Sequence, residues 1–118
     1  MQGIRATITF DADAPQPKMR GVVSGYQPHH HFEWSDFLTS GIHHYLDACR
    51  HYPGETLSVC IEFPFWSHFG SNVSVGDHFE ISEGSRIVGH GSVDAILETS
   101  SVIIVDVETG GGGSNDQI

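Results

Sequence analysis

Apolar and polar residues alternate along several stretches of the chain, which is the pattern of a β-strand with one buried face. The cleanest example is residues 57–65, where Leu, Val, Ile and Phe alternate with Ser, Cys and Glu. Similar alternation or a β-branched run predicts further strands over residues 4–10, 21–26, 29–34, 78–82, 86–97 and 101–107.

Turn residues separate these predicted strands. Pro53-Gly54, Gly76 and Gly84 each stand between two alternating stretches, where glycine and proline favour a reversal of the chain. Residues 35–52 are ambiguous, because their apolar residues are only partly at helical spacing and either a short helix or a turn fits. Six or seven strands with almost no helix indicate an all-β barrel or sandwich.

Three motifs follow one another along the chain: Gly-Tyr-Gln-Pro at 25–28, Pro-Gly-Glu at 53–55, and Glu-Gly-Ser-Arg-Ile-Val-Gly-His-Gly at 83–91. In this order they resemble the C-terminal β-barrel domain of elongation factor Tu, over roughly residues 4–98 and without a preceding GTPase domain. The resemblance implies a closed six-stranded antiparallel Greek-key barrel. It also implies that Glu83-Gly84 forms a hairpin tip, and that Gly89 and Gly91 lie where neighbouring strands crowd together.

The resemblance also implies a kind of function. In that family the domain has no catalytic residue, packs against other protein domains and touches the T-stem of aminoacyl-tRNA. The positions that match this RNA contact are His29, Thr39, Glu83 and Gly84. Where the family has basic or polar residues, this chain has Gln27, His29, Glu33 and Ser82. These replacements remove charges that pair with phosphate, so nucleic acid is not the expected partner.

Composition agrees with one globular domain, which we place at residues 1–109, followed by a flexible Gly-rich tail at 110–118. The 15 acidic and 5 basic residues give a net charge of −10, which disfavours nucleic acid and favours a basic protein partner. No phosphate-binding loop of the GxxxxGK[ST] type predicts nucleotide binding, and no apolar run predicts a membrane span. Two cysteines without a CxxC motif fit the reducing cytoplasm.

Nine histidines are the main candidates for metal chemistry. In a strand, His29 and His31 share one face about 7 Å apart, with His43, His44 or His51 as a third ligand for zinc, nickel or copper. The alternative is a surface rich in imidazoles, with or without a role in sensing pH, and with the neighbouring His30 in the place of an apolar ring. The spacing matches no known metal motif, so no cofactor is the main expectation.

Aromatic residues around the end of the 57–65 strand suggest an interaction surface. Trp66, together with Trp34 and Phe69, could form an exposed patch for a partner, or these rings could close the barrel ends. Phe63 is expected in the core. No serine stands in a G-x-S-x-G elbow, and the cysteines read as ordinary thiols, so the chain is not expected to be an enzyme.

The leading hypothesis is therefore a non-catalytic, protein-binding β-barrel. Its partner would contact the 35–52 segment, the Trp66 region or the hairpin tip. The candidate binding residues are His29, Trp34, Thr39, Trp66, Glu83 and Gly84. Two alternatives remain: a barrel that binds a metal or small ligand through His29, His31, His43 and His44, and a translation-related barrel that binds aminoacyl-tRNA or another RNA.

Overall fold

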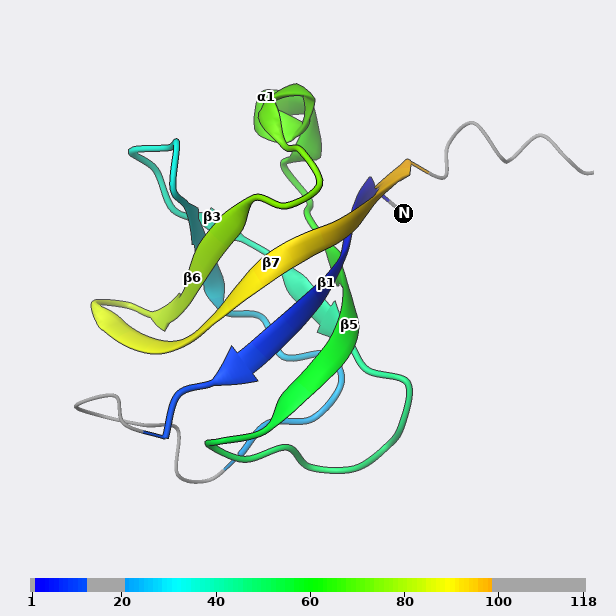
Figure 1. Cartoon of the computed structure of the whole chain (residues 1–118), viewed down its shortest axis with the longest axis vertical. Helices are drawn as coiled ribbons and strands as arrows, with labels where there is room; N and C mark the ends of the chain where they lie inside the picture. Colours follow the sequence, from blue (N-terminus) through cyan, green and yellow to red (C-terminus); the bar gives the residue numbers. More distant parts are fainter. Residues whose placement is uncertain (1, 13–20, 99–118) are drawn as a thin grey trace, which may run out of the picture.

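The computed structural model describes residues 2–12 and 21–98, and within them the fold is mostly antiparallel β-sheet (Figure 1). One short helix and one 3₁₀ turn interrupt the strands. The strands are β1 (Gln2–Phe10), β2 (His29–Phe32), β3 (Thr39–Ser40), β4 (Ile42–His44), β5 (Thr56–Glu62), β6 (His78–Glu83) and β7 (Arg86–Glu98); the helix is α1 (Trp66–Phe69) and the 3₁₀ turn is η1 (Gly70–Asn72). The predicted all-β class is confirmed.

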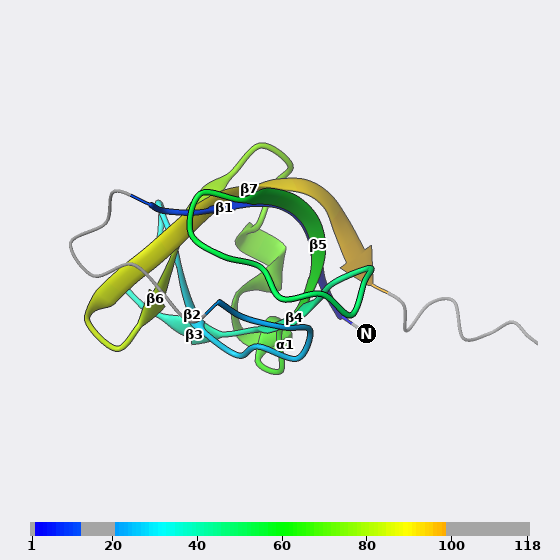
Figure 2. The same cartoon turned by 90° about the horizontal axis from the view of Figure 1, so that it is seen from below.

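The seven strands form one sheet in the order β3-β2-β6-β7-β1-β5-β4. The two end strands, β3 and β4, are joined by Gly41 alone, so the sheet must curl until its ends meet. Main-chain hydrogen bonds then tie β4 to the segment before β2: the His43 amide donates to the Tyr26 carbonyl at 2.8 Å, and the Gly25 amide donates to the His43 carbonyl at 2.7 Å. The result is a nearly closed barrel, seen as a ring of strands in Figure 2.

The expectation of six strands was wrong. Gly41 divides the closing segment into two short strands that pair with different neighbours, β2 and β5, which makes seven. A Cβ on Gly41 would lie only 2.7–2.8 Å from side-chain atoms of Ile61, His30 and Phe63. Glycine is therefore needed where the closing segment crosses the core.

The two strand glycines lie as expected. A Cβ on Gly89 would stand 2.6 Å from the Thr9 carbonyl oxygen on β1, and one on Gly91 would stand 2.7 Å from Phe79 Cζ on β6. Both are far below an ordinary van der Waals distance, so β7 packs closely against its neighbours only without side chains here. The hairpin tip is also confirmed, because Glu83 pairs with Arg86 and Gly84 has a φ of 62°.

Side chains from alternate positions of the strands point into the barrel and form its core. Phe63 is 2% exposed, as expected, and His30 is fully buried among Phe63 and Phe79, where the sequence suggested an imidazole in place of an apolar ring. The other large buried side chains include Ile4, Ile8, Phe10, Phe32, Val59, Ile61, Ile81, Val88 and Val93.

Several local predictions need correction. Residues 21–26 form no strand beyond a single bridge between Val22 and His51. Residues 35–52, whose sequence fits either a short helix or a turn, form turns and the two short strands β3 and β4, which were not predicted. The helix lies at 66–69 instead, where the sequence suggested only the end of a strand. Residues 101–107 and the predicted tail at 110–118 lie outside the described residues. None of the described helices is long and apolar enough to cross a membrane.

Candidate functional site

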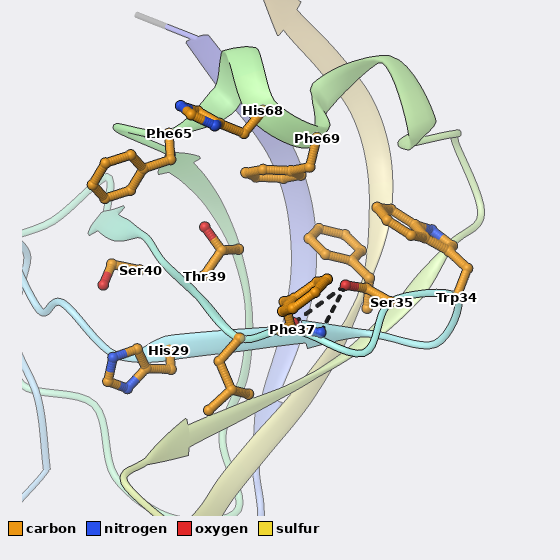
Figure 3. A pocket seen from close by; sticks show the side chains of 11 residues that line it. His29, Trp34, Ser35, Phe37, Thr39, Ser40, Phe65, His68 and Phe69 are labelled. Atoms are coloured by element: carbon orange, nitrogen blue, oxygen red, sulfur yellow. Dashed lines mark hydrogen bonds between the residues drawn. The ribbon is translucent and has the colours of Figure 1, made fainter.

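A groove of about 550 Å³ lies between the segment 33–40 and the helix α1. Figure 3 shows Phe65, His68 and Phe69 on one side, facing Trp34, Phe37 and His29 on the other. We call this hollow the aromatic groove. Its lining residues are His29, Phe32, Trp34, Ser35, Phe37, Leu38, Thr39, Ser40, Phe65, His68 and Phe69.

Local hydrogen bonds fix the loop that forms one wall of the aromatic groove. Ser35 donates its amide to the Phe32 carbonyl at 3.0 Å, and its own carbonyl accepts a bond from His31 Nε2 at 2.7 Å. The Ser35 hydroxyl accepts the Phe37 amide at 3.0 Å and donates to the Phe37 carbonyl at 3.3 Å, as drawn in Figure 3. Because serine closes this turn with its side chain, the wall is shaped before any ligand arrives.

Trp34 is held on the rim of the groove in one orientation. Its ring stacks on Phe32 with the centroids 5.2 Å apart and an interplanar angle of 18°. Its Nε1–H donates to the Asp77 carboxylate at 2.9 Å, and the same carboxylate oxygen accepts the Ser74 amide at 2.8 Å. The ring nevertheless remains 41% exposed. A tryptophan that is both fixed and exposed loses little side-chain entropy when a partner covers it.

Several of the apolar side chains that line the groove are exposed. Phe37 is 78% exposed, Phe65 57% and Leu38 51%, and all three line the same hollow. Phe32 beneath them is buried and packs on Phe69 with centroids 6.0 Å apart. Single exposed apolar side chains are common on proteins, whereas several that share one concave surface mark a binding site.

Charge is distributed unevenly around the groove. Its lining, as far as the structure describes it, contains no Asp, Glu, Lys or Arg. The neighbouring charges are acidic: Glu33 and Asp36 are exposed in the same loop as Trp34, and Asp77 accepts the bond from the indole. Residues 21–85 contain eight acids and a single Lys or Arg, Arg50, which lies beside residues 21–26 instead. The surroundings of the groove are therefore negative.

Three of the six predicted binding residues, His29, Trp34 and Thr39, come together in the aromatic groove. Of the two alternatives for Trp66, the structure shows a buried ring, so Trp66 is not one of the exposed binding residues. Its ring is 3% exposed, stacks on Phe63 and donates Nε1–H to Glu98 at 3.1 Å.

Gly70 explains the burial of this indole. A Cβ at that position would lie 2.2 Å from the Trp66 ring, so the glycine lets the main chain of η1 pass directly over it. Trp66 therefore anchors α1 to the core, and the groove is lined by His68 and Phe69 of α1 and by Phe65, the residue before the helix.

Glu83 and Gly84 lie away from the groove, at the β6–β7 turn on the far side of the barrel from α1 (Figure 1). The Glu83 carboxylate accepts the Tyr26 hydroxyl at 2.5 Å and also pairs with Arg86. Burial, and then the carboxylate of Glu83, raise the pKa of Tyr26 above its ordinary value. These contacts pin the hairpin tip to the segment before β2, which is a structural role.

His43 and His30 form a buried pair inside the barrel, with their Nε2 atoms 2.8 Å apart. His30 Nδ1 lies 3.3 Å from the Thr39 carbonyl, which can only accept, so this nitrogen carries the proton and His30 Nε2 is an acceptor. His43 Nε2–H then donates to His30, and His43 Nδ1 accepts the Tyr45 hydroxyl at 3.0 Å. Burial lowers the pKa of His30 to about 3 and that of His43 well below its usual value, so both are neutral.

The four histidines proposed as metal ligands are not brought together. His43 uses both ring nitrogens inside the core, and His31 donates to the Ser35 carbonyl. His44 Nε2 is bonded to Glu62 at 3.0 Å, and His29 lines the aromatic groove. Across residues 2–12 and 21–98, no three His, Cys, Asp or Glu side chains are placed to hold one metal ion. The two cysteines, Cys49 and Cys60, are free.

The sequence analysis missed Phe37, Leu38, Phe65 and His68 as members of the site. The signal for the first two was an adjacent apolar pair directly after Asp36, in a stretch too short to supply a helix face. Phe65 follows Pro64, which ends the strand pattern and leaves the next aromatic ring outside the sheet. Nothing local links these two segments, because they meet only when the barrel closes.

No protein family matches the chain, and no curated protein is similar to it at a significant level. The likeness to the C-terminal domain of elongation factor Tu therefore rests on the three motifs alone.

Proposed function

We propose that this protein is a non-catalytic binding module that docks a segment of a partner protein in the aromatic groove. The observation that carries the proposal is the combination of a fixed, exposed Trp34 with the exposed Phe37 and Phe65 around one hollow. Preorganised aromatic anchors that surround a pocket are typical of the energetic centre of a protein interface.

The likeness to the elongation factor Tu domain supports the same function without being needed for it. In that family the barrel acts by packing against other protein domains, and a barrel of that origin would carry docking surfaces of its own. We propose this origin on the motifs at 25–28, 53–55 and 83–91. The RNA contact of that family is not part of the proposal, because residues 21–85 hold eight acids against one cation.

A small apolar ligand is the second candidate occupant. A volume of about 550 Å³ lies within the range of small-molecule sites, and the lining offers His29, Thr39 and Ser40 as polar groups for orientation. The groove is, however, open along its rim, where Phe37 is 78% exposed. To contact the exposed side chains of this rim, a ligand must extend beyond the hollow. A protein segment is long enough to do so.

Peptide display tests the proposed function. Random peptides are selected against the wild-type protein and then measured against Phe37→Ser/Leu38→Ser, which removes two exposed groove residues, and against Leu46→Ser. Leu46 is 93% exposed and lies outside the groove, so it serves as the matched control. We expect selected peptides with aromatic or aliphatic anchors to bind the wild type and the control, and to lose at least about tenfold in affinity to the groove variant.

Selected peptides that bind all three proteins equally would contradict the proposal, as would a failure to select any peptide. Circular dichroism and urea unfolding of the groove variant provide the check on folding. Both replaced side chains are exposed, so we expect the free energy of unfolding to change by no more than about 0.5 kcal/mol.

A further inference from the structure

We infer that the segment docked in the aromatic groove is cationic, with an apolar anchor flanked by arginine or lysine. This inference rests on the proposed function and adds the chemistry of the partner. It depends on how charged and aromatic residues are interleaved around the groove, which is a separate observation from the hollow itself.

The loop 33–38 alternates the two kinds of contact. Its sequence, Glu-Trp-Ser-Asp-Phe-Leu, places the exposed carboxylates of Glu33 and Asp36 directly before Trp34 and Phe37. The hydrogen bonds of Ser35 fix this loop, so rings and carboxylates keep their relative places. A segment lying along the loop therefore meets an apolar surface and a negative charge in turn.

The indole of Trp34 is itself electron-rich and bonded to a carboxylate. Its Nε1–H donates to Asp77, which brings a third negative charge to the rim. An arginine or lysine near this ring would gain both from the π-face and from the nearby carboxylates. An acidic segment would meet repulsion from all three acids.

Lysine and arginine are scarce in the part of the chain that forms the groove. Between residues 21 and 85 the chain has only Arg50, beside the segment 21–26. Within residues 21–85, acids therefore outnumber lysine and arginine by eight to one. The net charge of −10 extends this field over the whole molecule and speeds the encounter with a basic partner.

The test uses three fluorescent peptides of one length. The first has a central Ile-Leu pair flanked by arginines, the second replaces each arginine with citrulline, and the third keeps the arginines but replaces the apolar pair with serines. Citrulline keeps the length and planar shape of arginine but has a carbonyl oxygen in place of one NH₂ group, which removes the charge. Each peptide is titrated with the full-length protein at low and at high salt.

Two double variants report on the protein side. Glu33→Gln/Asp36→Asn removes the two loop carboxylates, and Asp47→Asn/Asp94→Asn removes two exposed carboxylates that do not line the groove as the matched control. We expect the first to weaken binding of the arginine peptide by about fivefold to tenfold at low salt and by much less at high salt. The control pair should change the affinity by less than about twofold, because neither of its side chains lines the groove or belongs to the loop 33–38.

The outcomes separate the two proposals. Tighter binding of the arginine peptide than of both other peptides, lost in Glu33→Gln/Asp36→Asn and in Phe37→Ser, supports a cationic partner. If the arginine and citrulline peptides bind equally and Phe37→Ser still abolishes their binding, the proposal of a cationic partner is wrong. The proposal that the groove docks a protein segment is then still supported. Binding that Phe37→Ser does not change, or no binding by any peptide, overturns both.

Discussion

Gly89 lies where β7 passes closest to β1, and it shows how a single residue sets the distance between strands. Its backbone does not have a positive φ, so the need for glycine comes from space and not from the torsion angle. The obstacle is the main-chain oxygen of Thr9, 2.6 Å from the position of a Cβ, and a main-chain atom cannot move aside without shifting its strand.

We therefore expect Gly89→Ala to lower the free energy of unfolding by about 1–3 kcal/mol, the usual cost of overpacking. Ser92→Ala, three residues further along the same strand and half-buried, is the control and should change it by no more than about 0.5 kcal/mol. Urea unfolding monitored by tryptophan fluorescence measures both. Equal stability of Gly89→Ala and wild type would show that β1 and β7 can separate at no cost.

The two tryptophans show how one residue type serves two purposes. Each donates its indole N–H to a carboxylate, Trp34 to Asp77 and Trp66 to Glu98. Trp66 is covered by Gly70 and belongs to the core, whereas Trp34 stands on the rim of the aromatic groove. The sequence around each could not distinguish them, because the difference arises from which segments the barrel closure brings above the ring.

At the scale of elements, the segment β3–β4 joins the core to the groove. Thr39 lines the groove, and its carbonyl accepts a hydrogen bond from His30 Nδ1–H. His43 on β4 continues this chain of hydrogen bonds by accepting one from the Tyr45 hydroxyl. The direction of this chain requires both imidazoles to be neutral. If His30 gained a proton, both Nε2 atoms, 2.8 Å apart, would be donors and their hydrogen bond would be lost. If His43 gained a proton, its Nδ1 could no longer accept the Tyr45 hydroxyl.

This pair predicts loss of stability in acid. Burial lowers the pKa of His30 in the folded state to about 3. As the pH falls below about 6.5, this histidine therefore takes up a proton in the unfolded chain but not in the folded protein. The contribution of His30 is complete above pH 6.5 and falls by about 2 kcal/mol on acidification to about pH 5. His43 acts in the same direction. His51, whose pKa is raised by Glu55 and Asp47, offsets part of the loss.

Urea unfolding between about pH 7.5 and pH 5 measures this dependence in the wild type, in His30→Leu/His43→Leu and in His44→Gln. We expect the double variant to lose most of the acid sensitivity. His44 is the matched control, because it is the exposed neighbour of His43 on the same strand. A wild type and double variant with the same slope would contradict the prediction.

The strands that sequence could predict are those with long alternating patterns, and their physical basis is local. β1, β5 and β7 each have one face in the core, so the period of two is visible in the residues themselves. β3 and β4 are two and three residues long, and nothing in 39–44 marks them as strands. They exist because Gly41 lets the segment cross the core and pair with both ends of the sheet.

The same limit applies to the aromatic groove. Trp34, Thr39 and His29 could be named from the sequence as candidates, and they do share the hollow. Phe69 is also a candidate, grouped with Trp34, but Phe65, which is more than 20 positions from Trp34 along the chain, is not. Only the closed barrel shows that Phe65 completes the hollow.

At the scale of the whole molecule, the net negative charge lowers the stability of the folded state. A net charge of −10 on 118 residues repels itself most strongly in the compact state, since folding brings the carboxylates closer together. The ion pairs that offset this are few and mostly exposed in the described part, such as His44–Glu62 and His90–Asp11, and exposed pairs contribute little. The excess of acidic residues thus lowers the stability of the folded state. The basic partner proposed above gives a reason for the protein to carry them.

Salt should consequently stabilise this protein. Raising sodium chloride from about 10 mM to about 100 mM shortens the screening length from about 30 Å to about 10 Å, so repulsion between carboxylates further apart than about 10 Å is largely screened. We expect the melting temperature to rise by a few degrees, and to rise less in Glu33→Gln/Asp36→Asn, which carries two fewer negative charges. A melting temperature that falls with salt would mean that local pairs such as Arg86–Glu83 outweigh the long-range repulsion. In that case the negative field around the aromatic groove would be too weak to attract a basic partner.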